Sequence, residues 1–324
     1  MIFVKSPLRI TFGGGGTDLP SYYEKNTGFL ISATIDKYIY ITVYEPFKDY
    51  ILLKYSTNEK VTKIKNIKHP IIRKVLDKFY KNTKKIEIQI SADVPAGTGV
   101  GSSGAFTVAL IKALYAYNNQ SIGHNDLAEK SCSIEINELK RNVGKQDQYS
   151  SVFGGINSYE FKKNKVKVKP LKISKKTINN LEDNLCLFFT KFSRNADKIL
   201  KKQNIETINK NKKIISNLNF NKELAYKSKY FLENGQLENF ADILNDQWNC
   251  KIERSPETIN NRIKNLYNLG LKNGALGGKL VGAGGGGFLL FYTNDKEKLT
   301  YTMEKEGIGE MRFKFDFNGV TKII

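Results

Sequence analysis

The 324-residue sequence is long enough to bury a large core, and its 40% hydrophobic and 11% aromatic content is that of a folded protein. With three scattered cysteines and no apolar run near the roughly 20 residues that span a bilayer, it predicts a cytoplasmic protein without disulfides or a membrane partner. The net charge of +20 suggests polyanionic ligands, but only seven of the 52 basic residues are arginine, which disfavours nucleic acid.

The N-terminal half of the sequence mixes predicted strands and helices without a regular alternation. In chain order we expect strands over 38–45 and 86–95, a buried helix from Ser102 or Ser103, a helix over 129–139 and two basic strands over 154–173. This irregular order favours an α+β fold over a doubly wound sheet.

A boundary is expected near residues 170–180. Beyond it the sequence predicts a strand in LCLFFT, Lys-rich amphipathic helices to about Asn273, a strand in FLLFY and a short terminal helix and strand. We therefore expect two domains, over residues 1–175 and 176–324.

Thirteen of the 26 glycines lie in three short windows, at 13–16, 97–104 and 282–287. Glycine is concentrated in this way where the main chain must adopt unusual conformations or approach another group closely. Tight turns alone could explain one such window, but they explain three less well.

The middle window, PAGTGVGSSGA, contains G-x-G-x-x-G at Gly99, Gly101 and Gly104. A Rossmann loop would follow a continuously hydrophobic strand, whereas the preceding strand alternates, and a Walker A loop would end in Lys-Ser/Thr. What remains is a glycine loop that opens onto a helix start carrying Ser102 and Ser103, where free N–H groups and the helix dipole favour anions. The window therefore predicts a cradle for the triphosphate of ATP, with Mg²⁺ helping to neutralise its charge.

All three windows resemble motifs of the galactokinase, homoserine kinase, mevalonate kinase and phosphomevalonate kinase (GHMP) superfamily. PAGTGVGSSGA is similar to its P-x-G-x-G-L-G-S-S-A ATP loop, SPLRITFGGGGTDL to its N-terminal substrate motif and KLVGAGGGGFLLF to its C-terminal motif. The resemblance implies an N-terminal domain like ribosomal S5 domain 2, a C-terminal ferredoxin-like domain and an active site between them. The ATP loop that it implies comprises Pro95, Gly97, Thr98, Gly99, Gly101, Ser102, Ser103 and Gly104.

The same resemblance assigns roles to two carboxylates in IEINELKRNVGKQDQ. Asp147 matches the Asp that takes the proton from the acceptor hydroxyl, and Arg9 matches the cation that pairs with it. Glu135 matches the helical Glu that ligates Mg²⁺ together with Ser103. Alternatively, Glu135 lies on a solvated helix face and Asp147 is a turn residue. Phosphoryl transfer can also proceed mostly by positioning, so Asp147 could only orient the hydroxyl.

The first window bears on the sugar. Asp18 matches the sugar-binding Asp of galactokinases, but Gly15 and Gly16 replace their Glu-His pair, which removes two polar contacts and opens space. The wider string, with FSRNADKIL and GALGGKL, resembles members that phosphorylate the anomeric C1 hydroxyl of D-glycero-D-manno-heptose 7-phosphate for nucleotide-heptose synthesis. The substrate-binding residues expected from this are Gly15, Gly16, Thr17, Asp18, Arg194, Gly284 and Gly285.

A sugar 7-phosphate requires a second cationic pocket. We expect Arg194, at a predicted helix start, to serve there, with Lys251 and Arg254 as second choices and a surface role as the alternative for Arg194. The two histidines lie outside the motifs and are expected to have structural or solvent roles. Trp248 is expected to be a packing residue, with stacking on ATP or on the sugar as the alternative.

Three readings of the whole chain stay open at this point. They are a heptose 7-phosphate kinase, a fucokinase-like or galactokinase-like sugar-1-kinase, and a basic nucleic-acid-binding protein with an S5-like domain. The oligomeric state is open as well.

Overall fold

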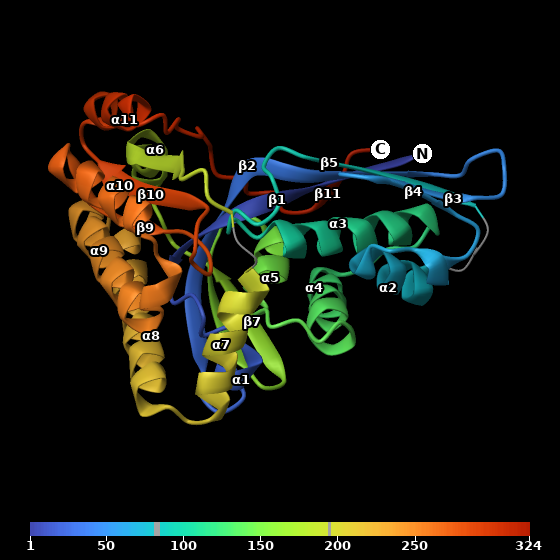
Figure 1. Cartoon of the computed structure of the whole chain (residues 1–324), viewed down its shortest axis with the longest axis horizontal. Coiled ribbons are helices and arrows are strands. Elements are labelled where there is room, and N and C mark those ends of the chain that lie inside the picture. The colour runs from blue at the N-terminus through green and yellow to red at the C-terminus, as the bar shows by residue number, and fades with distance from the viewer. Residues whose placement is uncertain (81–84, 194–195) are drawn as a thin grey trace.

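A computed structural model describes residues 1–80, 85–193 and 196–324. The described chain forms two sheets, each with helices packed on it (Figure 1). The larger sheet has eight strands and is built around the long antiparallel pair β1 (Ile2–Gly13) and β2 (Gly28–Tyr44). Its other strands are β3 (Ile51–Lys54), β4 (Asn58–Val61), β5 (Ile86–Ala92), β6 (Ile156–Lys162), β7 (Lys165–Pro170) and β11 (Thr321–Lys322).

The alternation in β2 decides which face of this sheet is covered. Ile39, Ile41 and Val43 are buried, whereas Tyr38 and Tyr40 point to the opposite face and stay partly exposed. Helix α3 lies along the buried face, as Figure 1 shows. The helices of this unit are α1 (Pro20–Tyr23), η1 (Ile64–Asn66), α2 (Pro70–Phe79), α3 (Ser102–Tyr117), α4 (His124–Cys132), η2 (Ser133–Glu138) and α5 (Gln146–Phe153).

The second sheet is antiparallel, in the order β8 (Leu185–Phe189), β10 (Phe288–Thr293), β9 (Ala275–Leu280). A single bridge from Glu310 to Phe188 extends it beyond β8. This is the β-α-β-β-α-β succession of a ferredoxin-like unit, with its last strand reduced to one bridge. The helices of this part are α6 (Lys175–Asn184), α7 (Ala196–Ile208), α8 (Lys212–Glu233), α9 (Leu237–Arg254), η3 (Pro256–Thr258), α10 (Asn261–Lys272) and α11 (Lys296–Lys305).

The predicted α+β fold is confirmed, and the structure adds detail at the domain boundary. The first sheet's β7 ends at Pro170 and the second sheet begins at Leu185, but the C-terminal strand β11 returns to pair with β1. Ile324 accordingly lies beside Phe3, and Figure 1 shows the two termini together. We keep the division into 1–175 and 176–324 as a proposal, with β11 as a strand contributed back to the N-terminal unit.

Several sequence expectations meet the structure directly. The helix expected over 129–139 is instead the end of α4 followed by a π-helical turn, η2, a form that is frequent at functional sites. All three cysteines are free and buried. None of the helices in the described ranges is long and apolar enough to cross a bilayer. Trp248 is a packing residue, stacked on Tyr267 with ring centroids 4.2 Å apart.

Candidate active site

The second and third glycine windows pack directly against each other. Gly282 has φ +76°, and a Cβ there would lie 2.5 Å from the carbonyl oxygen of Gly99. A Cβ on Gly287 would overlap the carbonyl of Thr98 in the same way. The third window is therefore glycine-rich because its main chain lies against the main chain of the loop before α3, which it holds in place.

That loop ends at the start of α3, where two more glycines make room for catalytic candidates. Gly101, at φ +83°, is the N-cap residue, and a Cβ there would lie 3.1 Å from Arg9 Cγ. A Cβ on Gly104 would lie 2.5 Å from Asp147 Cβ. Only glycine lets β1 and α5 bring these two side chains up to the helix start.

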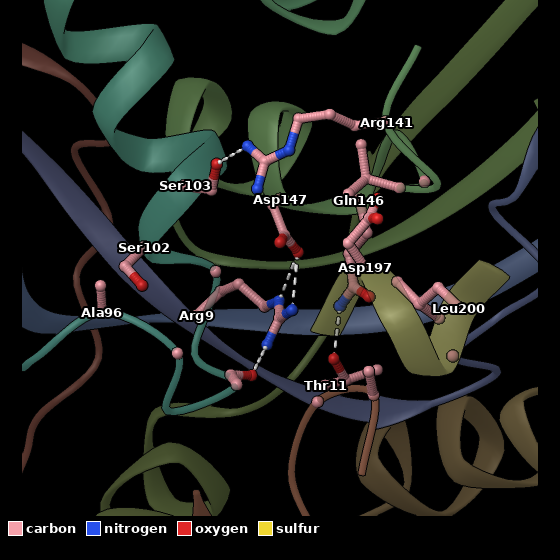
Figure 2. Close-up of a pocket in the computed structure, with 18 of the residues that line it drawn as sticks. Arg9, Thr11, Ala96, Ser102, Ser103, Arg141, Gln146, Asp147, Asp197 and Leu200 are labelled. Carbon is pink, nitrogen blue, oxygen red and sulfur yellow. Dashed lines mark hydrogen bonds and ion pairs between the residues drawn. The ribbon is translucent and has the colours of Figure 1, made fainter. Parts of the chain in front are cut away.

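Arg9 of β1 and Asp147 of α5 form an ion pair at that point (Figure 2). Arg9 Nε and Nη2 donate to Asp147 Oδ1 at 2.9 and 2.6 Å, while Nη1 donates to the carbonyl of Gly99 at 2.6 Å. The Arg9 side chain is 7% exposed and that of Asp147 is 30% exposed. The cation is thus fixed to the loop, and the carboxylate faces open space.

A second polar group surrounds Glu135, which the π-helical turn carries. Its carboxylate accepts hydrogen bonds from Ser103 Oγ (2.6 Å), Thr107 Oγ1 (3.1 Å) and Gln148 Nε2 (2.9 Å). Arg141 Nη1 lies 2.7 Å from both Glu135 Oε2 and Ser103 Oγ, as Figure 2 shows for the serine. Burial raises the pKa of Glu135, although Ser103, Arg141 and Gln148 oppose the shift. A solvated helix face is excluded, because Glu135 is only 1% exposed.

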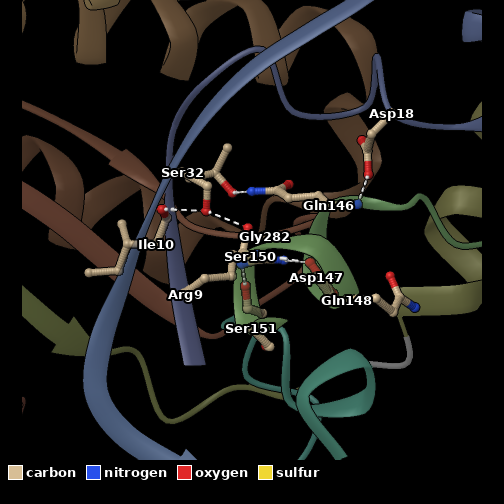
Figure 3. Close-up of polar contacts among 12 residues, drawn as sticks. Arg9, Ile10, Asp18, Ser32, Gln146, Asp147, Gln148, Ser150, Ser151 and Gly282 are labelled. Atoms are coloured by element: carbon tan, nitrogen blue, oxygen red, sulfur yellow. Dashed lines mark hydrogen bonds and ion pairs between the residues drawn. The ribbon is translucent and has the colours of Figure 1, made fainter. Parts of the chain in front are cut away.

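Asp18 closes the other end of the site. Its carboxylate accepts from the N–H groups of Gly16 and Gln146, each at 3.1 Å (Figure 3). A Cβ on Gly144 would overlap this carboxylate, so glycine is required before Gln146. Burial, and next the charge of Asp147, raise the pKa of Asp18. The side chain of Gln146 donates to Thr11 Oγ1 at 2.5 Å.

These groups line one cavity of about 900 Å³. The expected site residues on its wall are Arg9, Gly15, Gly16, Asp18, Gly97, Gly99, Gly101, Ser102, Ser103, Asp147 and Gly284. Glu135 lies behind Ser103 and reaches the cavity through that hydroxyl. The structure thus brings the three glycine windows and both carboxylates together, while their chemical roles stay predictions.

Some expected residues lie off the cavity wall. Within the described ranges these are, besides Glu135, the residues Thr17, Pro95, Thr98, Gly104 and Gly285. Thr17 is a correction to the expected sugar contacts, because its fully buried hydroxyl donates to the Gly14 carbonyl at 2.8 Å and accepts from the Phe29 N–H at 3.1 Å. Thr98 donates to the carbonyl of Pro95 at 2.9 Å and shapes the loop from behind. Arg194 lies outside the described residues.

The sequence did not reveal an apolar wall made by Tyr55, His69 and Phe106. His69 Nδ1 caps α2 by accepting a hydrogen bond from the Ile72 N–H at 3.3 Å. The His69 ring makes T-shaped contacts with the rings of Tyr55 and Phe106, at centroid distances of 5.2 and 5.3 Å. Burial lowers the pKa of His69. A lone histidine before a proline gives no sequence signal for this wall. Arg141 was also not predicted from the sequence. Arginine is scarce in this chain, and this scarcity could have drawn attention to the residue.

Comparisons with known proteins identify the family of this chain. Residues 66–155 match the GHMP kinases N terminal domain, and residues 228–308 match the GHMP kinases C terminal region. The D-glycero-alpha-D-manno-heptose 7-phosphate kinase of Campylobacter jejuni is 32% identical over 98% of this chain and 98% of its own length. The bifunctional fucokinase/GDP-fucose pyrophosphorylase of Arabidopsis thaliana is 25% identical over 91% of this chain, which corresponds to 30% of that protein.

A crystal structure of a D-glycero-D-manno-heptose 1-phosphate kinase from Bacteriodes thetaiotaomicron has a TM-score of 0.82 to this chain, at 24% identity, and covers 100% of this chain and 99% of its own. The fold is the two-domain fold of GHMP kinases, with mixed helices and sheets. The chain belongs to the GHMP kinase family, as its glycine windows predicted. It is a sugar kinase, and GHMP kinases use ATP as co-substrate.

Proposed function

We propose that this kinase transfers the terminal phosphoryl group of ATP to the anomeric C1 hydroxyl of D-glycero-D-manno-heptose 7-phosphate, giving the 1,7-bisphosphate for nucleotide-activated heptose synthesis. The observation that carries the proposal is the Arg9–Asp147 pair at the start of α3, inside a cavity large enough for a nucleotide and a sugar phosphate. The similarity to the Campylobacter jejuni kinase over nearly its whole length supports this choice of sugar.

The cavity offers separate walls for the two substrates. The loop from Gly97 to Ser103 presents main chain and a helix N-terminus to the phosphates of ATP, and the apolar wall of Tyr55, His69 and Phe106 suits a purine base. The sugar would lie toward Asp18, where Gly15 and Gly16 leave space. In this arrangement the acceptor hydroxyl faces Asp147 and the terminal phosphate faces Ser103.

Asp147 would accept or orient the proton of the acceptor hydroxyl. Both of its described hydrogen bonds from Arg9 go to Oδ1, so Oδ2 can take the hydroxyl. Arg9 fixes the direction of the carboxylate, and it also anchors the loop through Gly99. Little covalent chemistry is required of the protein, because phosphoryl transfer depends mainly on alignment and charge neutralisation.

Ser103 and Glu135 fit a magnesium ion. A hydroxyl and a carboxylate are hard oxygen ligands, and Mg²⁺ is commonly held by one or two carboxylates together with substrate phosphates. Arg141 places a positive charge 2.7 Å from both oxygens, so the pair already accommodates a cation. Bound there, Mg²⁺ would neutralise charge on the phosphates.

A panel assay tests the proposal. ADP release is measured with D-glycero-D-manno-heptose 7-phosphate, the unphosphorylated heptose, galactose and fucose, with Asp147→Asn as the control. We expect the highest kcat/KM with heptose 7-phosphate, and a ³¹P spectrum of the product with a new phosphate coupled to the anomeric proton. A product phosphorylated at any other position, or no preference for heptose 7-phosphate, would reject the proposal.

A fucokinase-like activity is the second candidate, because the Arabidopsis thaliana relative matches over 91% of this chain. The same panel decides between them. Free fucose giving a higher kcat/KM than heptose 7-phosphate would favour this candidate.

A further inference from the structure

The cavity wall on the side of α9 and β9 carries three basic side chains that the transfer chemistry described above does not use. Lys251 and Arg254 come from α9 and Lys279 from β9. Lys251 is 8% exposed and Lys279 is 5% exposed, so both are more than nine-tenths buried. Buried lysines are rare unless they are paired, and this group, the cationic cluster, therefore needs an explanation.

Neutral partners hold the cluster in place. Lys251 Nζ donates to the carbonyls of Leu280 and Gly282 at 2.5 and 2.6 Å. Lys279 Nζ donates to Gln247 Oε1 at 2.5 Å, and Arg254 Nη1 donates to Asn217 Oδ1 at 3.1 Å. An ammonium has three donors, so both lysines have further N–H groups that can reach a ligand in the cavity.

The charge of the cluster is not balanced within the described part of the chain. No carboxylate there forms an ion pair with Lys251, Arg254 or Lys279. The cations that act on the two lysines are Arg9 and Arg254, and for Lys251 also Lys279, while Cys250 acts in the opposite direction. Burial lowers the pKa of Lys279 to about 7, and it lowers the pKa of Lys251 well below its ordinary value. Such a group is unfavourable when empty and binds a compact dianion strongly.

We propose that Lys251, Arg254 and Lys279 form a subsite for a phosphoryl dianion of a substrate, and that this dianion is the 7-phosphate that the sugar acceptor already carries. The assignment rests on the proposed function, since it requires a sugar acceptor that already carries a phosphate. It moves the sugar-phosphate site from Arg194, the first expectation, to α9 and β9, where the second choices Lys251 and Arg254 are joined by Lys279.

The terminal phosphate of ATP is the other source of the same chemistry. Lys251 contacts the carbonyl of Gly282, which packs on Gly99 of the ATP loop, so the cluster also borders the nucleotide site. The sugar is favoured because the cluster shares α9 with Gln247, whose amide donates to the Phe12 carbonyl at 2.7 Å beside the first glycine window. Asp18, the expected sugar ligand, lies two residues after that window.

Lys279→Met and Arg254→Met test the subsite, because Lys251 also anchors the third window and its loss would disturb the loop. The matched control is Lys272→Met, because Lys272 is an exposed lysine at the end of α10. Binding of heptose 7-phosphate, unphosphorylated heptose and ADP is measured by calorimetry, alongside the KM for sugar and for ATP. Thermal unfolding of each variant establishes that it is folded.

We expect both variants to weaken heptose 7-phosphate about 10- to 100-fold, the loss of one hydrogen bond to a charged group, with ADP and the unphosphorylated sugar changed less than about threefold. A selective loss of ATP affinity would keep the phosphoryl subsite but assign it to the nucleotide. Folded variants that bind all ligands like Lys272→Met would overturn the inference. The wild-type protein is measured before any variant. If it shows no preference for the phosphorylated sugar, the proposed function fails instead of the subsite assignment.

Discussion

Arg9 directs two of its N–H groups to one oxygen of Asp147, Oδ1, at 2.9 and 2.6 Å. The pair is end-on, so Oδ2 receives no hydrogen bond from Arg9, and Asp147 lines the cavity. A structural ion pair would usually engage both carboxylate oxygens in the fork geometry of arginine. The end-on arrangement instead keeps one oxygen for an acceptor hydroxyl while the guanidinium fixes the direction of the carboxylate.

Replacement of Asp147 by Asn tests this arrangement. The amide keeps the size of the side chain but cannot take a proton, so we expect kcat to fall about 10²- to 10⁴-fold, with KM for ATP nearly unchanged. Initial rates of ADP release at saturating sugar measure it. A loss smaller than about threefold would show that Asp147 does not act on the acceptor hydroxyl.

Gly104→Ala tests the close approach of α5 to α3. The new Cβ would lie 2.5 Å from Asp147 Cβ, so α5 must move. We expect the free energy of unfolding to fall by about 1–3 kcal/mol, as is typical of overpacking. As a fraction of its wild-type value, kcat should fall more than the free energy of unfolding does. Denaturant titration and initial rates measure the two effects. Gly309→Ala is the control because its Cβ meets nothing within 4 Å, and an equal response of the two variants would contradict the prediction.

Glu135→Gln tests the metal assignment. The substitution keeps a side chain of the same size beside Ser103 but removes the negative charge, so we expect a higher Mg²⁺ concentration for half-maximal rate. The readout that does not depend on turnover is the rise in Tm caused by ADP with Mg²⁺. This rise should shrink in the variant, while ADP with EDTA gives the same Tm in both proteins. An unchanged Mg²⁺ response would exclude Glu135 as a ligand.

The cationic cluster predicts a pH dependence of stability in the ligand-free enzyme. The pKa of Lys279 is about 7 in the folded state and near 10.4 in the unfolded chain, so the unfolded state binds more protons between these values. The cluster therefore destabilises most below pH 7, and the penalty is relieved as the pH rises from about 7 toward 10. Arg9 and Arg254 are the facing charges that depress the pKa further.

Lys279→Met should remove this penalty. We expect the variant to gain Tm relative to wild type at pH 6, by about 2–4 °C for each kcal/mol recovered, and to gain less at pH 9. Calorimetric scans at the two pH values measure the difference. The same gain at both values would mean that Lys279 does not titrate in this range.

The glycine windows made the ATP loop predictable, because so much glycine in short stretches has few explanations other than close main-chain approach. Arg9 was predictable for a related reason, since arginine is scarce in this chain. Among the described residues, Arg141 and Arg254 line the same cavity, so scarcity pointed further than the sequence motifs did.

Other parts of the site could not be predicted. Lys279 is one of many lysines, and although Lys251 was a second choice for the sugar phosphate, only the packing of α9 on β9 brings the two together. The turn-forming role of Thr17 depends on Phe29, which the sequence does not identify as its partner. The π-helical turn that directs Glu135 inward has no simple sequence pattern, and strands as short as β3 and β4 fall below what alternation can indicate.

The most direct test is a crystal structure with a non-hydrolysable ATP analogue, Mg²⁺ and heptose 7-phosphate. We predict the terminal phosphate between Ser103 and Asp147, with the C1 hydroxyl within hydrogen-bond distance of Asp147 Oδ2. A triphosphate bound away from the start of α3, or a sugar whose C1 hydroxyl points away from Asp147, would contradict the account.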